Sequence, residues 1–189
     1  MVINLILALS LQCFTDHVKL LSSVEITKPM KVSSGRSLSD RKMRRLINTW
    51  VGVSDDKDVR ILSIAWIESR LRPWVRRGDK GKACGMHQIH ARYSYPLFSR
   101  KRGFNGWKAS SLNSRSKILR ECSKLESSKY SMTTMKKLLN IFDSRDKHPC
   151  HHNSGLYGKC NGWYKTRLEV VTLYLHYAKY VCGGKAPWL

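Results

Sequence analysis

At 189 residues the chain has room for one domain with a sizeable core, and its 42% hydrophobic content excludes a disordered polycation. The sequence holds 35 Lys and Arg against 13 Asp and Glu, a formal net charge of +22 that indicates an anionic polymer or surface as partner. Because the cations are dispersed along the chain, this charge fits action on a bacterial envelope at least as well as a nucleic-acid groove.

The N-terminal region begins with a short apolar run at residues 2–11. The run is too short for a stable membrane-spanning helix but long enough for the apolar part of a signal peptide. No Lys or Arg precedes it and no small-residue cleavage site follows, so a buried strand or helix is an equal alternative. Residues 15–39 lack long apolar periodicity and predict a linker or loosely attached arm. We therefore expect a signal-like segment and linker over residues 1–40, and one domain over residues 41–189.

The domain is predicted to be mainly α-helical, because alternating strand patterns are scarce. Between the predicted helices, residues 73–90 contain three glycines and are expected to be loop for most of their length. Besides the helix discussed next, apolar periodicity predicts helices at residues 41–50, 114–129, 131–142 and 163–181, the last of them long and ended by glycines.

A carboxylate lies on the apolar face of a helix that is expected to begin near residue 55 and to end near Leu71, because Pro73 disfavours helical geometry at the residue before it. With a period of 3.6 residues, Glu68 shares this face with Ile61, Ile64 and Ala65. Desolvation raises the pKa of such a carboxyl, and the negative end of the helix opposes its ionisation. Glu68 is therefore a candidate proton donor near neutral pH, with an ordinary solvent-facing Glu at a frayed helix end as the alternative.

The six cysteines leave their pairing open. If Cys13 is removed with a signal peptide, an odd number remains. Cys150 and Cys160 are close enough in sequence to close a short loop, and two histidines follow Cys150, which suggests zinc. The ligand spacings of structural zinc sites are missing, however, so we expect no metal.

Four short motifs follow one another along the chain. They are Glu68-Ser69, Gly85-Met86-His87-Gln88-Ile89, Asn153-Ser154-Gly155 and Tyr164-Lys165-Thr166-Arg167. In order and interval this series resembles the lysozyme-like lytic transglycosylases, especially the small forms of phages and of conjugation or secretion systems. The similarity covers about residues 55–171. No single motif is specific, so the resemblance depends on the order of all four.

The resemblance implies a lysozyme-like single domain with a substrate cleft and a long C-terminal helix. It makes Glu68 the lone catalytic acid and base, with Tyr164 beside it to orient it. The remaining implied roles are a hydrogen bond near the acid from Ser69, a lining of the glycan cleft by Met86, and contacts to the substrate's acetamido and backbone groups from Gln88 and Asn153.

Each of these residues also has a purely structural interpretation. Ser69 would satisfy the last carbonyls of its helix, and Met86 would fill the core. Asn153 would be a turn residue beside a glycine, and Tyr164 an amphipathic residue opening a helix. Gln88 is different, because a glutamine among apolar neighbours needs polar partners wherever it lies.

The chain also departs from the family pattern. His152 stands where the family has an aromatic residue before the Asn, and His87 stands where a less polar residue is usual. The loop between Glu68 and Gln88 is a little long and very basic. Cys84 beside the second motif suggested a disulfide to Cys150, which would place both substrate loops across one cleft.

The implied activity is cleavage of the β-1,4 bond between N-acetylmuramic acid and N-acetylglucosamine in peptidoglycan, with a 1,6-anhydro product and no cofactor. The implied partners are glycan strands and the anionic envelope, in an extracytoplasmic setting: the periplasm, the secreted fraction, a virion or a secretion machine. One alternative is a hydrolytic lysozyme that uses Asp79 as second carboxylate, although Asp79 lies among cations and is readily explained as an exposed ion pair. Another is a non-catalytic polyanion-binding or nucleic-acid-binding protein, which the charge supports without any recognised nucleic-acid-binding motif.

Overall fold

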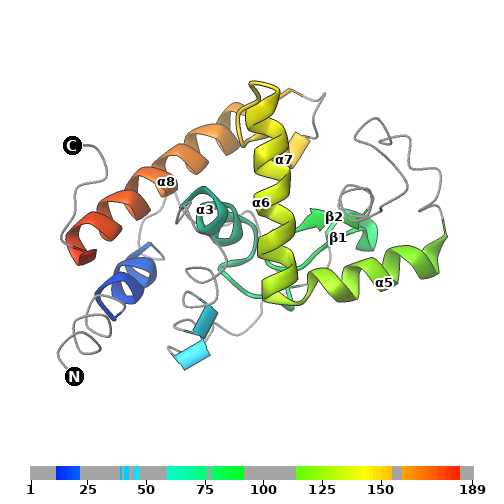
Figure 1. The fold of residues 1–189 in the computed structure, drawn as a ribbon, viewed down its shortest axis with the longest axis horizontal. Helices are drawn as coiled ribbons and strands as arrows, with labels where there is room; N and C mark the ends of the chain where they lie inside the picture. The colour runs from blue at the N-terminus through cyan, green and yellow to red at the C-terminus, as the bar shows by residue number, and fades with distance from the viewer. Residues whose placement is uncertain are drawn as a thin grey trace.

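The computed structural model describes residues 12–21, 39, 41–42, 45–46, 59–75, 78–91, 114–154 and 159–183. This part of the chain is mostly helical, which confirms the predicted class. Its main helices are α3 (Val59–Ser69), α5 (Arg115–Leu125), α6 (Ser128–Ser144), the short α7 (His151–Ser154) and the long C-terminal α8 (Gly162–Gly183). Figure 1 shows α3 at the centre, and α3 packs against both α8 and α6.

The central helix α3 is buried around almost its whole circumference, because its sequence is apolar on every side. The buried Ser63 of this helix donates to the Val59 carbonyl and accepts a hydrogen bond from Thr172 of α8 at 3.0 Å. The helix ends in two left-handed residues, Arg70 (φ 55°) and Leu71 (φ 62°). The Leu71 N–H donates to the Ala65 carbonyl at 3.2 Å and the Arg70 N–H donates to the Trp66 carbonyl at 3.0 Å, so two of the last carbonyls of the helix are satisfied. The predicted end near Leu71 is therefore confirmed to within two residues.

A small hairpin lies in the stretch expected to be loop. Strand β1 (Ala83–Cys84) pairs antiparallel with β2 (Ile89–His90), after a 3-10 turn η2 (Asp79–Gly81). The turn between the strands starts at Gly85, which has a φ of +72°. A Cβ at this position would lie 2.1 Å from the carbonyl oxygen of Leu125, so the hairpin touches the end of α5 through a bare backbone. Only glycine allows this approach.

Helices α5 and α6 confirm the two helices predicted from periodicity, although α5 ends four residues before the predicted position 129 and α6 begins three residues before the predicted position 131. The side chain of Ser114 caps α5 by accepting from the Lys117 N–H at 3.3 Å. Helix α6 buries one apolar stripe, formed by Met132, Met135, Leu138, Leu139 and Phe142. For α8 (Gly162–Gly183), the predicted range 163–181 is correct to within two residues at each end.

The N-terminal segment departs from the expected linker. Residues 12–20 are helical, and Phe14, Val18 and Leu21 belong to the hydrophobic core. His17 lies 3.0 Å from the Tyr174 hydroxyl of α8 through its Nδ1. A short helix held by such distant contacts leaves little periodic signal in its own sequence. Within the basic helix expected at residues 41–50, the described residues are helical and the others lie outside the described part. Within the described residues, no helix is long and apolar enough to cross a membrane.

Three disulfides connect the six cysteines. Cys150 pairs with Cys160, as the short spacing suggested, while Cys84 pairs with Cys122 and Cys13 with Cys182. The suggested Cys84–Cys150 bond is therefore wrong, because the hairpin packs against α5 and thus beside Cys122. His17 and His148 each lie near one of these cysteine pairs, but disulfide sulfurs are not the thiolates that bind metals.

Candidate active site around Glu68

Glu68 lies in the last turn of α3 and faces the start of α8. The Tyr164 hydroxyl donates a 2.8 Å hydrogen bond to its Oε1 atom. Tyr164 is held in place by the N-terminus of α8, where the side chain of Asn161 accepts from the N–H groups of Trp163 and Tyr164. Only 17% of the Glu68 side chain is exposed, so the carboxyl is largely withdrawn from water.

The surroundings of Glu68 favour its protonated form near neutral pH. Burial raises its pKa from the ordinary value of 4.5 to about 7, and two weaker effects oppose this: the hydrogen bond from Tyr164 and the positive charge of Arg167. Arg167 is fully buried one turn along α8, with its guanidinium 5.0 Å from the centre of the Trp163 ring. Glu68 is thus balanced between acid and carboxylate, as a group that must first donate and then accept a proton requires.

A second side chain approaches the same carboxyl oxygen. His152 of α7 has its Nε2 atom 4.0 Å from Glu68 Oε1, and 5% of its side chain is exposed. Its Nε2 also bonds to the carbonyl oxygen of His87, and since a carbonyl only accepts, the proton of His152 is on Nε2. Burial lowers the pKa of His152 to about 4, so the ring is neutral near pH 7.

The His87 side chain connects this group to the helical core. Its Nε2 bonds to the Ile61 carbonyl of α3 at 3.2 Å, so this nitrogen carries the proton. Its Nδ1 therefore accepts from the Ser131 hydroxyl of α6 at 2.8 Å. Burial lowers the pKa of His87 to about 3, so it too is neutral. The imidazole of His87 is thus hydrogen-bonded through both of its nitrogens.

The two carboxyl oxygens of Glu68 have different surroundings. Tyr164 donates to Oε1 and His152 lies beside it, whereas no described residue donates to Oε2. In the neutral carboxyl the acidic proton accordingly belongs on Oε2, because Oε1 already accepts from Tyr164. No carboxylate is among the described groups that act on Glu68; these are Tyr164, Arg167 and His152.

The other predicted site residues lie close by but are bound within the protein. Ser69 donates to the Ala65 carbonyl at 3.0 Å and accepts from the Arg72 N–H, which is its structural interpretation. Gln88 has the polar partners it needs in its own loop, since its amide accepts from Gly78 N–H and donates to the Gly85 carbonyl.

Met86 and Asn153 complete the set. Met86 is 0% exposed and belongs to the core, so in this structure it has no surface with which to line a cleft. Met86 lies in the turn between β1 and β2. The backbone of Asn153 belongs to α7, beside His152, and its side chain lies outside the described part.

Asp79, the alternative second carboxylate, has a different partner. Its Oδ2 atom lies 2.8 Å from Nε2 of His90, and 58% of its side chain is exposed. Of the four cations around Asp79 in the sequence, Lys80 and Lys82 belong to the described part of the chain, and those at positions 76 and 77 lie outside it. Asp79 therefore has the exposed, paired character of an ordinary surface carboxylate.

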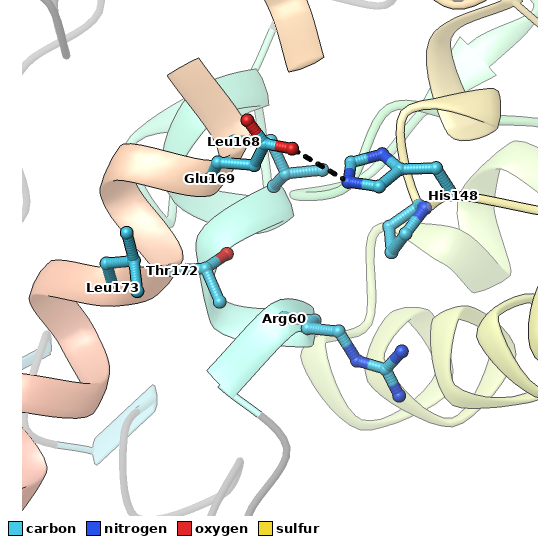
Figure 2. Close-up of a pocket in the computed structure, with 7 residues that line it drawn as sticks. Arg60, His148, Leu168, Glu169, Thr172 and Leu173 are labelled. Atoms are coloured by element: carbon cyan, nitrogen blue, oxygen red, sulfur yellow. Dashed lines mark ion pairs between the residues drawn. The ribbon is translucent and has the colours of Figure 1, made fainter. Parts of the chain in front are cut away.

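A separate pocket of about 470 Å³ lies between the first turn of α3, the middle of α8 and the segment before α7 (Figure 2). Across it His148 Nε2 faces Glu169 Oε1 at 3.4 Å. None of the predicted site residues lines this pocket. Its lining consists of Arg60, His148, Pro149, Leu168, Glu169, Thr172 and Leu173.

Two residues of the Glu68 site had no role assigned from the sequence. In the sequence, His152 is notable only as a departure from the family motif before Asn153. Arg167 is only the final residue of the motif that begins at Tyr164. Their places depend on contacts between α3, α7 and α8, which no local pattern reveals. Comparisons of the chain with protein-family models, with curated proteins and with solved structures found no match.

Proposed function

We propose that this protein is a peptidoglycan-cleaving lytic transglycosylase with a lysozyme-like fold and Glu68 as its single catalytic acid and base. One observation carries the proposal: a carboxyl at the end of a buried helix, held by Tyr164 and with a pKa near 7, where the sequence motifs require it. A carboxylic acid of this kind is a proton donor suited to glycosidic cleavage at neutral pH.

The proposed reaction needs only one carboxyl from the protein. Glu68 Oε2 protonates the leaving glycosidic oxygen, and the N-acetyl carbonyl of the muramic acid attacks its own anomeric carbon as the bond breaks. The C6 hydroxyl then displaces that carbonyl oxygen, and the Glu68 carboxylate takes the hydroxyl proton. The enzyme returns to its starting state and the sugar ends as a 1,6-anhydro ring. The absence of a carboxylate from the described groups acting on Glu68 supports this sequence over a two-carboxylate one.

Digestion of purified peptidoglycan followed by mass spectrometry of the fragments tests this proposal. We expect 1,6-anhydro ends as the main product, and Asp79→Asn should keep most of the activity, since the carboxylate of Asp79 is exposed and paired with His90. Reducing ends together with an inactive but folded Asp79→Asn would instead assign a two-carboxylate lysozyme. Failure to release any fragment would favour a non-catalytic polyanion-binding protein.

The charge of the chain and its disulfides support the proposed setting. Three disulfides fit an oxidising, extracytoplasmic compartment such as the periplasm, the outside of the cell or a virion. A net charge of +22 fits capture of glycan strands within an anionic envelope, by a free enzyme or by one belonging to a virion or secretion machine.

Capture by charge predicts a strong dependence on salt. Retention of the protein on isolated envelope should weaken several-fold when salt rises from about 0.1 M to about 1 M, because the screening length falls from roughly 10 Å to roughly 3 Å. A co-sedimentation assay measures this, and retention that ignores salt would make the charge incidental to binding.

A further inference from the structure

His152 has a single N–H within reach of two acceptors. In this structure the Nε2–H is bonded to the carbonyl oxygen of His87, while Oε1 of Glu68 lies 4.0 Å from the same nitrogen. A neutral imidazole has only one donor, so His152 serves one acceptor at a time. When Glu68 is protonated, the carbonyl is the better acceptor. When Glu68 is ionised, a carboxylate oxygen is the better one, because hydrogen bonds to a charged acceptor are about twice as strong.

His152 lies between two anchored parts of the chain. The disulfide between Cys150 and Cys160 joins the segment just before His152 to the start of α8, which carries Tyr164. On its other side, the acceptor carbonyl belongs to His87, whose own ring is fixed by Ile61 and Ser131. The His87 carbonyl is thus next to an anchored ring, and Oε1 of Glu68 is held by Tyr164, so a turn of the imidazole is the one movement that the exchange requires.

We propose that His152 is a positioning residue for Glu68, which holds its N–H on the His87 carbonyl while the carboxyl is protonated and turns it to Oε1 when the carboxyl ionises. This inference rests on the proposed function, because a lone acid and base must exist in both states within each cycle. A donor that binds only the carboxylate stabilises the state in which Glu68 waits to accept the proton of the C6 hydroxyl.

The charged and titratable neighbours of the pair are few in the described part of the chain. Glu68 faces Tyr164 and Arg167 from α8 and His152 from α7, and His152 faces Glu68 and His87. The pKa of His152, near 4, lies well below that of Glu68, near 7. His152 therefore stays neutral while Glu68 titrates. The effect of a substitution at residue 152 is then measured as a change in the pKa of Glu68 alone.

The test compares His152→Phe, which keeps a ring but removes the donor, with His152→Gln, whose amide keeps a donor near the place of Nε2. The first readout needs no activity. The free energy of unfolding is measured across a pH range for two proteins, one with Glu68 and one with Glu68→Gln. The difference between the two values changes with pH and levels off at a constant value once the pH exceeds the folded-state pKa of Glu68. In the His152→Phe background this pH should rise by about one unit, the size expected for one lost hydrogen bond to a charged group. His152→Gln should return it to near the wild-type value.

The second readout is the pH profile of peptidoglycan cleavage. In His152→Phe the alkaline limb of this profile should move to higher pH. The value of kcat should fall by a larger factor than the value of KM changes. Unchanged level-off pH in His152→Phe, or equal shifts in the Phe and Gln variants, would overturn the proposal and leave His152 a packing residue. If His152→Phe does not fold, His152→Met is judged by the same criteria. If the wild type cleaves nothing, the proposed function fails, while the stability readout still decides whether His152 binds the Glu68 carboxylate.

Discussion

Glu68→Gln is expected to lower the rate of peptidoglycan cleavage by a factor of about 100 to 10,000, because the variant keeps the shape of the side chain and loses its proton. The substitution should leave the fold intact. The Gln side chain still accepts the hydrogen bond from Tyr164 through its carbonyl oxygen, in place of Glu68 Oε1. Cleavage is measured by release of soluble fragments from purified peptidoglycan, and full activity in this variant would end the assignment of Glu68 as the acid.

The same substitution should stabilise the protein above neutral pH. Folding raises the pKa of Glu68 from 4.5 to about 7, so its contribution to stability is fully present below pH 4.5 and is lost as the pH rises through 7. At higher pH the unfolded chain is stabilised by ionisation of Glu68, which burial disfavours in the folded protein. The neutral amide avoids this loss, and the variant should be more stable by up to about 3 kcal/mol at pH 8, with little difference at pH 4. Denaturant titrations across this pH range measure it.

A matched control is Glu169→Gln. Glu169 lies on α8 with 47% of its side chain exposed, where it pairs with His148 and Lys165. Exposed pairs of this kind contribute about 0 to 1 kcal/mol, so the control should change stability little, and cleavage should continue. A stability difference for Glu68→Gln that does not vary with pH would show that the carboxyl is not withdrawn from water in solution.

Gly85→Ala is expected to unfold the protein or to destabilise it by roughly 4 kcal/mol, since two penalties add at this residue. Its φ of +72° is unfavourable for any side chain, which costs about 1 to 3 kcal/mol. The new methyl group would also lie 2.1 Å from the carbonyl oxygen of Leu125 and 3.2 Å from the hydroxyl of Ser131. Relief of that overlap requires the hairpin to move away from α5, at about 1 to 3 kcal/mol.

Gly81→Ala separates the two penalties. Gly81 has a φ of +86°, and no atom lies within 4 Å of a Cβ placed there, so only the backbone penalty remains. We expect a loss of about 1 to 2 kcal/mol for this variant. Thermal or denaturant unfolding measures both. Equal losses in the two variants would mean that the hairpin is not in contact with α5 as described.

The parts of the fold that were predictable are those encoded by local periodicity. Helices α5, α6 and α8 each carry an apolar stripe at helical spacing, and α3 has a recognisable stop before Pro73. The helix at residues 12–20 was missed, because the core contacts and the disulfide that hold it come from distant segments.

The candidate site could be predicted only where its residues belong to a local sequence motif. Glu68 and Tyr164 came from motifs, and the structure brings them together. Ser69 and Gln88 came from the same series of motifs, yet the structure has their polar groups bound to nearby backbone. The position of His152 beside Glu68 was not accessible to sequence reasoning, because it results from the packing of α7 against two elements far away in the chain.

The disulfide between Cys13 and Cys182 makes most of the polypeptide a covalent macrocycle. It joins residues 169 positions apart, and the bonds at Cys84–Cys122 and Cys150–Cys160 form two smaller rings inside it. Closing so large a ring removes conformational freedom from the unfolded chain worth about 5 kcal/mol on a chain-entropy basis. A protease that cuts one exposed peptide bond within the macrocycle therefore opens a ring without releasing a fragment, and the helices on either side of the cut stay tethered in place.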